Sequence, residues 1–405
     1  MLFISKVFKR YSIKDIFLFC IKYLIGIPLH MFSYVCPRNK KKWVFGHQNG
    51  FVDNSKYLYI YLINNTNEKV IWVAHSRTLY KEMRQKGLPV CYKYCFIGLY
   101  HLLTAYYYVK TSSPRNVCYW TSGGAFKVDL WHGVGIKAIG ESSASLGASS
   151  FLSKIIIPRD QPNVFLSTSE FMTDHFTKSK KIERQNIYEG IYPRCKFLLE
   201  NEAFQLSFIS KYESKYSKEF IEKLRCFDRV FIYMPTWRLM YEEKLIDVAL
   251  PDFEKLNEEL LKINGLFIIK PHAAMRTIIK KAGNYSNIIS IIPETDIYPI
   301  LPFTDVLITD YSSIYYDYLL MDGKGCILYD FDYDQYVKKE YKFICDYKEY
   351  TPGPHVRSFE ELLQILSTNK PFDIKRREWI LEKFWGNYEA KDLRSLYEAI
   401  VNKKK

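Results

Sequence analysis

Four short polar motifs each follow an apolar run, and their residue types could together grip a diphosphate. Asp-Tyr-Ser-Ser, at residues 310–313, comes directly after the apolar residues 306–309. Two hydroxyls and the backbone N–H groups of a helix start can hold a phosphate without a metal. Trp-His-Gly, Pro-Thr-Trp-Arg and Lys-Pro-His lie upstream. The residues that the four motifs contribute are Trp131, His132, Gly133, Thr236, Arg238, Lys270, His272, Asp310, Ser312 and Ser313.

These residue types match the needs of phosphoryl-linked group transfer without a metal. The diphosphate must be neutralised, the departing nucleoside phosphate stabilised and the attacking hydroxyl deprotonated. Ser312 and Ser313 could meet the first need, and Arg238 could add a bidentate clamp. His272 could donate to a phosphate oxygen or protonate the leaving group. His132 could act as the general base, because imidazole titrates near neutral pH.

Each motif taken alone has a plainer structural interpretation. Asp and Ser are favoured helix N-caps, so residues 310–313 alone predict a cap. Pro-Thr-Trp-Arg alone predicts a turn with a packed Trp, and Lys-Pro-His a strand end with a solvated His. The glycine beside His132 is more telling, because it lets a ligand approach the backbone closely. All four motifs in this order favour a functional site.

The elements that must position these motifs form an alternating α/β pattern from residue 42 onward, which is typical of parallel sheets with crossover helices. Three motifs follow predicted strand ends, where ligands bind in such sheets. We predict two Rossmann-like halves with a cleft between them, and an amphipathic C-terminal helix with a basic tail over residues 375–405. The predicted strands are residues 43–46, 70–74, 107–111, 117–120, 164–168, 230–234, 266–270, 288–292, 306–309 and 326–329. The predicted domains are residues 1–41 (N-terminal helical segment), 42–190 (acceptor domain), 191–385 (nucleotide-donor domain) and 386–405 (C-terminal helix and tail).

Composition indicates a globular protein with an anionic partner. A chain of 405 residues exceeds what one hydrophobic core usually serves, and 48% hydrophobic with 25% charged residues is ordinary for folded domains. The formal charge of +14 suggests an acidic lipid or polyanionic substrate; without a basic helix or a nucleic-acid module, nucleic acid is disfavoured. Nine cysteines without a Cys-x-x-Cys pair argue against disulfides and a zinc cluster. No dinucleotide fingerprint or Walker loop is present, so no cofactor is predicted.

The apolar N-terminal stretch, residues 16–35, is long enough to span a bilayer. Lys22 and His30 interrupt it, however, and Gly26 and Pro28 break its middle. Basic residues on both flanks disfavour a spanning helix, whereas the 17% aromatic content suits a membrane interface. We predict one or two helices on an acidic cytoplasmic leaflet, and a helix pair packed on the first domain remains the alternative. The flanking basic residues are Lys6, Lys9, Arg10, Lys14, Arg38, Lys40, Lys41 and Lys42.

The order of the motifs resembles the CDP-glycerol glycerophosphotransferase family, the teichoic acid and capsule polyol-phosphate primases and polymerases. The similarity covers nearly everything after residue 41, including residues 53–58, 130–140, 307–318 and 352–354. It implies a GT-B-like fold, a metal-independent site between the two domains and association with the inner membrane face. The resemblance implies His132 as the base and His272 as a contact of the donor phosphates, and we predict catalytic roles for both histidines. It also implies donor binding by Arg238, Asp310, Ser312 and Ser313. We further predict donor binding by Thr236 and Lys270, and acceptor-side roles for Trp131, Gly133 and Lys137.

The predicted activity is transfer of glycerol phosphate from CDP-glycerol to a hydroxyl of a membrane-linked saccharide or growing polyol-phosphate chain, with release of CMP. Val134 and Gly135 stand where the family usually has Thr-Pro, which predicts a differently shaped acceptor-side loop. CDP-ribitol or another activated polyol remains an alternative donor. Two further alternatives are a GT-B glycosyltransferase using a nucleotide sugar, and a peripheral protein that binds anionic lipid or polymer without catalysis.

Overall fold

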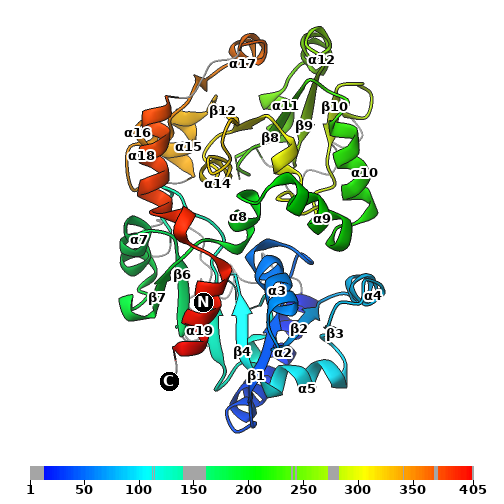
Figure 1. Ribbon diagram of the computed structural model, residues 1–405, viewed down its shortest axis with the longest axis vertical. Coiled ribbons are helices and arrows are strands. Elements are labelled where there is room, and N and C mark those ends of the chain that lie inside the picture. The colour runs from blue at the N-terminus through cyan, green and yellow to red at the C-terminus, as the bar shows by residue number, and fades with distance from the viewer. Residues whose placement is uncertain are drawn as a thin grey trace. The chain divides into compact units, whose positions relative to one another are not determined.

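The strands of the computed structural model form two parallel sheets, as the alternating pattern predicts (Figure 1). The strand orders are β3-β2-β1-β4-β5-β6-β7 and β10-β9-β8-β11-β12-β13. The chain divides into two compact units: unit 1 is Met1–Phe51 with Leu58–Leu130, and unit 2 is Val52–Tyr57 with Trp131–Lys405. The predicted domain boundaries stay a prediction. The structure describes residues 13–111, 113, 115–139, 161–238, 240–241, 244–271, 282–340, 342–368 and 373–403.

Unit 1 is built on five strands buried from both sides. The central strand β1 pairs in parallel with β2 and β4, so that Val44 lies in register with Ile71 and Tyr108. The consecutive residues Trp43, Val44 and Phe45 point alternately to the two faces and are all fully buried, as expected for a sheet covered on both faces. The elements are α2 (Ile13–Ser33), β1 (Asn39–Phe45), α3 (Asp53–Asn65, whose first residues belong to unit 2), β2 (Lys69–Ala74), α4 (Arg77–Gln85), β3 (Val90–Tyr92), α5 (Phe96–Thr104), β4 (Ala105–Lys110), the 3-10 turn η1 (Tyr119–Thr121) and β5 (Phe126–Asp129).

Residues 117–120 are not the strand that their apolar character predicts. Tyr119 and Trp120 lie in η1, where they pack against α2 instead of entering the sheet. The imidazole of His30 stacks on the Tyr119 ring, with 4.5 Å between centroids. A Cβ on Gly26 would lie 2.4 Å from the Trp120 ring, so only glycine permits this approach. Tertiary packing therefore overrides the β propensity of this segment.

Helix α2 is one continuous helix that includes both Gly26 and Pro28. One face packs on η1, while Leu24, Ile25 and Met31 keep 75%, 64% and 68% of their surface exposed. The contacts with η1 agree with the alternative of helical packing on the first domain, whereas the predicted contact with an acidic leaflet stays a prediction. Among the helices described, none combines the length and the apolar character needed to cross a bilayer.

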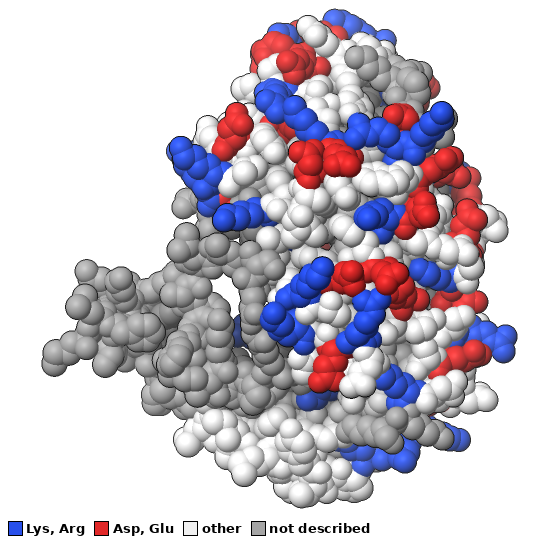
Figure 2. All heavy atoms as spheres, turned by 90° about the vertical axis from the view of Figure 1, so that its left-hand side faces the viewer, with Lys and Arg blue, Asp and Glu red and all other residues white. Residues whose placement is uncertain are grey.

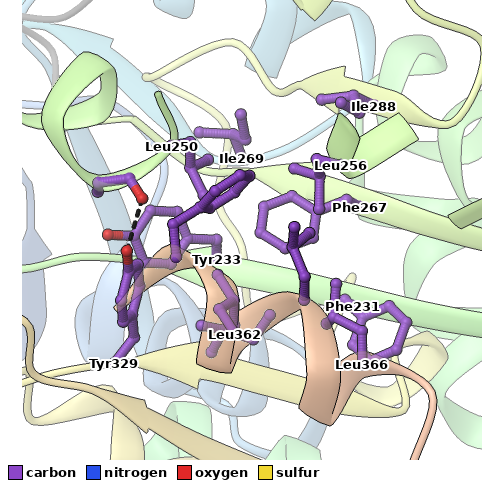
Figure 3. Packing of buried hydrophobic residues seen from close by; sticks show 14 of the residues in the cluster. Phe231, Tyr233, Leu250, Leu256, Phe267, Ile269, Ile288, Tyr329, Leu362 and Leu366 are labelled. Carbon is purple, nitrogen blue, oxygen red and sulfur yellow. Dashed lines mark hydrogen bonds between the residues drawn. The ribbon is translucent and has the colours of Figure 1, made fainter. Parts of the chain in front are cut away.

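Unit 2 holds the second sheet, whose core is closed by helices on its face (Figure 3). Phe231 of β8 lies in register with Phe267 of β9, and Leu362 of α17 packs in the same cluster. The Tyr329 hydroxyl donates to the Ala249 carbonyl oxygen at 2.7 Å. The elements are β6 (Val164–Ser167), α7 (Glu170–Lys180), η3 (Arg184–Asn186), β7 (Ile187–Glu189), α8 (Pro193–Leu198), α9 (Glu202–Tyr212), α10 (Lys215–Leu224), β8 (Arg229–Met234), α11 (Leu245–Ala249), α12 (Phe253–Lys262), β9 (Gly265–Ile269), β10 (Ile288–Ser290), η5 (Leu301–Phe303), β11 (Val306–Thr309), α14 (Ile314–Tyr318), β12 (Gly325–Tyr329), α15 (Tyr333–Lys339), α16 (Tyr347–Tyr350), β13 (His355–Val356), α17 (Phe359–Leu366), α18 (Ile374–Trp385), η6 (Tyr388–Ala390) and α19 (Leu393–Asn402).

The C-terminal stretch forms two helices, where the sequence predicts one. Helix α18 ends at Gly386, which has φ +57°, a conformation that glycine adopts without a Cβ penalty. Helix α19 then begins after Asp392, whose carboxylate accepts from the backbone N–H of Ser395. Local capping chemistry therefore divides the amphipathic pattern.

Positive charge is not gathered into one stripe on the face shown in Figure 2. Lys and Arg side chains alternate there with Asp and Glu. Among the basic residues predicted to flank the N-terminal helix, Lys40 and Lys41 are exposed, but Lys42 is buried. The Arg38 guanidinium donates to the carbonyl oxygens of Ala105, Thr121 and Gly123. Arg38 and Lys42 therefore hold unit 1 together instead of facing outward.

Candidate active site

Unit 2 contains a pocket of about 370 Å³ where three of the four motif segments meet. Strand β11 pairs with β8 with Thr309 in register with Met234, so the segments that follow these strands leave the same edge of the sheet. Residues 235–237 and 311–313 form part of the wall, and residues 131–137 with 139 form another part. The remaining lining residues are Met172, His175 and Phe176 of α7 and Tyr316 of α14.

Of the ten predicted site residues that the structure describes, seven line this pocket and three do not. Arg238 and Asp310 are buried behind the wall. The Lys270 ammonium donates to the Pro293 carbonyl oxygen, and Lys270 is not among the lining residues. His272 lies outside the described residues. The predicted residues that line the pocket are Trp131, His132, Gly133, Lys137, Thr236, Ser312 and Ser313.

The Trp-His-Gly turn has an unusual backbone that presents His132 at the pocket. His132 is exposed, and its ring centroid lies 4.1 Å from that of Trp131. Trp131 has φ +51°, in the left-handed region that side-chain-bearing residues rarely adopt, and Gly133 has φ +151°. A Cβ on Gly133 would lie 2.9 Å from Oγ and 3.3 Å from Cβ of Ser313. The glycine beside the histidine therefore permits close approach to the serine pair, as well as an otherwise strained backbone.

Replacing Gly133 by alanine is expected to lower turnover by at least about tenfold, because the new methyl group displaces Ser313 and tilts the His132 turn. The matched control is Gly323→Ala: Gly323 has φ +73° but open space around its missing Cβ. Both variants incur a backbone cost of about 1–2 kcal/mol, measurable by urea denaturation. Equal turnover in the two variants would mean that the approach to Ser313 has no functional weight.

The serine pair is not a helix cap in the expected way. Helix α14 spans only five residues, Ile314–Tyr318, and the Ser313 hydroxyl forms no side-chain cap hydrogen bond. Both Ser312 and Ser313 line the pocket. A dipole contribution from so short a helix is small, so any anion held here would depend on hydroxyls, backbone N–H groups and nearby cations.

A fully buried ion cluster supports the loops behind the pocket. One Arg238 amino group lies 2.7 Å from Asp310, and Nε lies 2.6 Å from Asp332. Asp310 also accepts from the backbone N–H of Thr236 at 2.9 Å, which ties the two motif loops together. Burial tends to lower the pKa of Arg238, but the two carboxylates raise it above its ordinary value. Arg238 is therefore charged and engaged, and its predicted contact with the donor stays a prediction. No motif singled out Asp332.

Lys137 brings positive charge to the pocket wall. Its Nζ lies 3.3 Å from Thr236 Oγ1, and its backbone pairs with Phe343 in an antiparallel bridge. Burial lowers the pKa of Lys137 to about 8, while Asp310 acts to raise it and Arg238 to lower it further. Most Lys137 side chains are thus protonated at neutral pH, but they lose their charge within about one pH unit above it. The neighbouring Thr236 hydroxyl could bind the same anion.

Helix α7 supplies lining residues that no sequence motif indicated. Burial lowers the pKa of His175 to about 4, so its imidazole is neutral near pH 7. Phe176 packs edge-on against Trp131, with 5.6 Å between ring centroids, and also against Phe165. In the sequence these residues have only the ordinary spacing of one helix face, which does not indicate a site. The tertiary fold brings them to the pocket.

Comparison with known proteins identifies one family over most of the chain. Residues 29–402 match the family model described as CDP-Glycerol:Poly(glycerophosphate) glycerophosphotransferase. A teichoic acid poly(ribitol-phosphate) polymerase of Bacillus spizizenii is 27% identical over 68% of this chain, but the match covers only 43% of that protein. A teichoic acid glycerol-phosphate transferase of Staphylococcus aureus is 23% identical, with 82% of this chain and 84% of that protein covered.

Solved structures of a wall teichoic acid polymerase, TagF, share the fold. One superposes with a TM-score of 0.73 at 19% identity and covers 95% of this chain and 96% of that one. This likeness and the two parallel sheets confirm the prediction of two Rossmann-like domains of the GT-B-like class. The predicted cleft between them stays a prediction.

Proposed function

Because the chain belongs to the CDP-glycerol:poly(glycerophosphate) glycerophosphotransferase family, we propose that it transfers glycerol phosphate from CDP-glycerol to a hydroxyl of a membrane-linked saccharide or growing polyol-phosphate chain. Transfer of a polyol phosphate is the general activity of this family, and CDP-glycerol is the specific donor that we propose. The observation that carries the proposal is the gathering of His132, Lys137, Thr236 and the serine pair around one pocket.

The reaction breaks the bond between the bridging oxygen and the phosphorus that carries glycerol. The acceptor oxygen forms a new bond to that phosphorus, its proton passes to the His132 imidazole, and CMP leaves with the bridging oxygen. Lys137 and the Ser312 and Ser313 hydroxyls neutralise the diphosphate as negative charge moves to the leaving group. Arg238 holds the two donor-side loops from behind, and His272 is proposed to assist the leaving CMP.

The donor is tested by incubating the protein with CDP-glycerol or CDP-ribitol and a lipid-linked acceptor. CMP release and product mass are measured, the latter showing the polyol added and whether one or many units are added. Release of CMP from CDP-glycerol with the matching mass gain supports the proposal. A mass gain with CDP-ribitol alone would show that CDP-ribitol is the donor. This alternative is included because one relative is a poly(ribitol-phosphate) polymerase. Transfer of a sugar from a nucleotide sugar would place the chain among glycosyltransferases.

We propose a metal-independent reaction, so a chelator should leave the rate unchanged.

The Michaelis constant for the donor is expected to rise above pH 8. The pKa of Lys137 is lowered to about 8 mainly by burial, so its charge is lost as the pH rises through this value. A single linked proton gives an increase of up to about tenfold in KM per pH unit above the pKa. Lys137→Arg should keep KM flat, because arginine stays protonated. The control is Lys270→Arg: burial also lowers the pKa of Lys270 to about 8, but this residue is outside the pocket lining. If Lys270→Arg flattens the profile instead, the phosphate-binding lysine is Lys270.

We propose that unit 1 binds the anionic cytoplasmic face of the cell membrane through an apolar surface. Besides α2, the start of α5 exposes Phe96, Ile97 and Tyr100, at 92%, 66% and 58%. Polar rims around exposed apolar side chains are typical of membrane-interface proteins. Of the described basic residues that were predicted to flank the N-terminal helix, Lys40 and Lys41 are exposed.

The double variant Phe96→Ser with Ile97→Ser is expected to lose most co-sedimentation with vesicles that contain anionic lipid. Removing two exposed apolar side chains removes area that would be buried in the headgroup region. Val248→Ser, a substitution of an exposed apolar residue in unit 2, serves as the control. Unchanged vesicle binding of the double variant would restrict any membrane contact to α2.

A further inference from the structure

We propose that Arg194 is a positioning residue that, with Asn54, holds the Trp131–His132 turn so that the His132 imidazole is presented to the pocket. The inference rests on the proposed function of His132 as the base. Neither Arg194 nor Asn54 lines the pocket, so both would act through the turn and not on substrate.

The Arg194 guanidinium reaches three oxygens at once. One amino group donates to the His132 carbonyl oxygen at 2.8 Å and to Asp317 Oδ2 at 2.9 Å, and the other donates to Asp53 Oδ1 at 2.6 Å. Arg194 is 7% exposed and Asp317 is fully buried. Only a planar fork with several donors can serve these acceptors together, which distinguishes arginine from lysine at this position.

Asn54 holds the neighbouring carbonyl of the same turn. Its Nδ2 donates to the Trp131 carbonyl oxygen at 3.0 Å, and its Oδ1 accepts from the backbone N–H of Arg194 at 3.2 Å. The carbonyl oxygens of two consecutive residues, Trp131 and His132, are thus each held by a buried side chain. Asn54 and Arg194 are also joined to each other, so the two anchors form one unit.

Anchoring of this kind has a physical purpose here. The left-handed φ of Trp131 costs about 1–2 kcal/mol and persists only where the surroundings over-determine it. Releasing either carbonyl would let the turn relax towards ordinary φ values and would carry the His132 ring with it. A misplacement of about 1 Å is enough to cost a hundredfold in rate.

Asp317 connects this anchor to Ser312 and Ser313, the serine pair proposed to bind the donor diphosphate. Asp317 lies on α14, which begins directly after Ser313, and it also accepts from the hydroxyl of Tyr298. The Arg194 guanidinium lies over the Tyr298 ring, 4.4 Å from its centroid. The same buried cluster therefore fixes the turn that carries His132 and the helix that follows the serine pair. This holds the proposed base at a constant position relative to Ser312 and Ser313.

The main test compares turnover with donor binding in Arg194→Lys, Asn54→Ala and the double variant. Each single variant is expected to lower kcat by roughly tenfold to hundredfold, with the donor KM within about twofold of wild type. The double variant should be little worse than either single variant, because both anchor one turn. Asn54→Ala removes no charge and keeps the test available if Arg194→Lys fails to fold. Normal kcat in a folded single variant overturns the inference.

The matched control is Glu213→Gln, which disturbs a second buried ion cluster in the same unit. Glu213 contacts the ammonium of Lys56, which also lies 2.8 Å from Asp296, and none of the three lines the pocket. This variant should lower Tm without changing kcat. Equal losses of kcat in Glu213→Gln and Arg194→Lys would show that general destabilisation explains the effect.

A second readout does not depend on turnover. The His132 ring resonance, assigned by comparison with His132→Ala, is expected to shift or broaden in Arg194→Lys and Asn54→Ala but not in Glu213→Gln. An unchanged resonance overturns the inference even if no donor is turned over. Failure of the proposed function is recognised separately: wild-type protein would then release no CMP, or His132→Ala would release it normally.

Discussion

Replacing His132 by alanine is expected to lower CMP release from the CDP-polyol donor by about 10²- to 10⁴-fold, the usual contribution of a general base. His132 is exposed at the pocket on a strained turn, beside the residues proposed to hold the diphosphate. Because the imidazole takes the acceptor proton only in the transition state, kcat should fall while the donor KM stays close to wild type. Initial rates of CMP release at saturating acceptor provide the measurement.

The control is His47→Ala, which removes an imidazole from unit 1, outside the pocket lining. It should leave kcat unchanged. Near-normal turnover of His132→Ala would remove the base from this position. His272→Ala, measured in parallel, tests the predicted second histidine; a large loss there alone would move the acid–base role to the Lys-Pro-His motif.

Replacing Arg238 by leucine is expected to lower the free energy of unfolding by about 3–5 kcal/mol, since removal of one partner leaves buried charges uncompensated. Arg238 is fully buried between Asp310 and Asp332. Burial already raises the pKa of Asp332 above its ordinary value, while Arg238 acts to lower it. Without Arg238 the folded-state pKa of Asp332 rises further, so the variant should regain stability relative to wild type as the pH falls and the Asp332 carboxyl group protonates. Urea denaturation at several pH values measures both effects.

Arg184→Leu is the control for this second prediction. Arg184 also pairs with two carboxylates, Glu170 and Asp174, but all three side chains are about half exposed or more. Solvent screens such pairs, so little change in stability is expected. A loss in Arg238→Leu as small as that in Arg184→Leu would mean that water reaches the buried cluster and that Arg238 does not tie the motif loops together.

Much of the fold followed from local pattern. Apolar runs of strand length separated by helix-length segments predicted parallel α/β sheets, and nine of the ten predicted strands overlap observed ones. The exception, residues 117–120, carries aromatic rings that are used for packing against α2. Short strands such as β3 and β7, of three residues each, were not predicted, because three residues are too few to show an alternating pattern. The break at Gly386 depends on a local φ value that an amphipathic pattern does not reveal.

For the site, the sequence by itself determined which chemistry was available: imidazole, hydroxyls and cations at the carboxyl ends of strands, in an order typical of one family. Only the tertiary structure decided which of them meet. It brought His132, Lys137 and the serine pair to one pocket and placed Arg238 behind the wall, paired with Asp332. It also joined Asn54, Arg194 and Asp317, far apart in the chain, beneath the His132 turn. The physical reason is that spacing along a strand or helix sets local direction, whereas burial and ion pairing depend on neighbours that folding alone supplies.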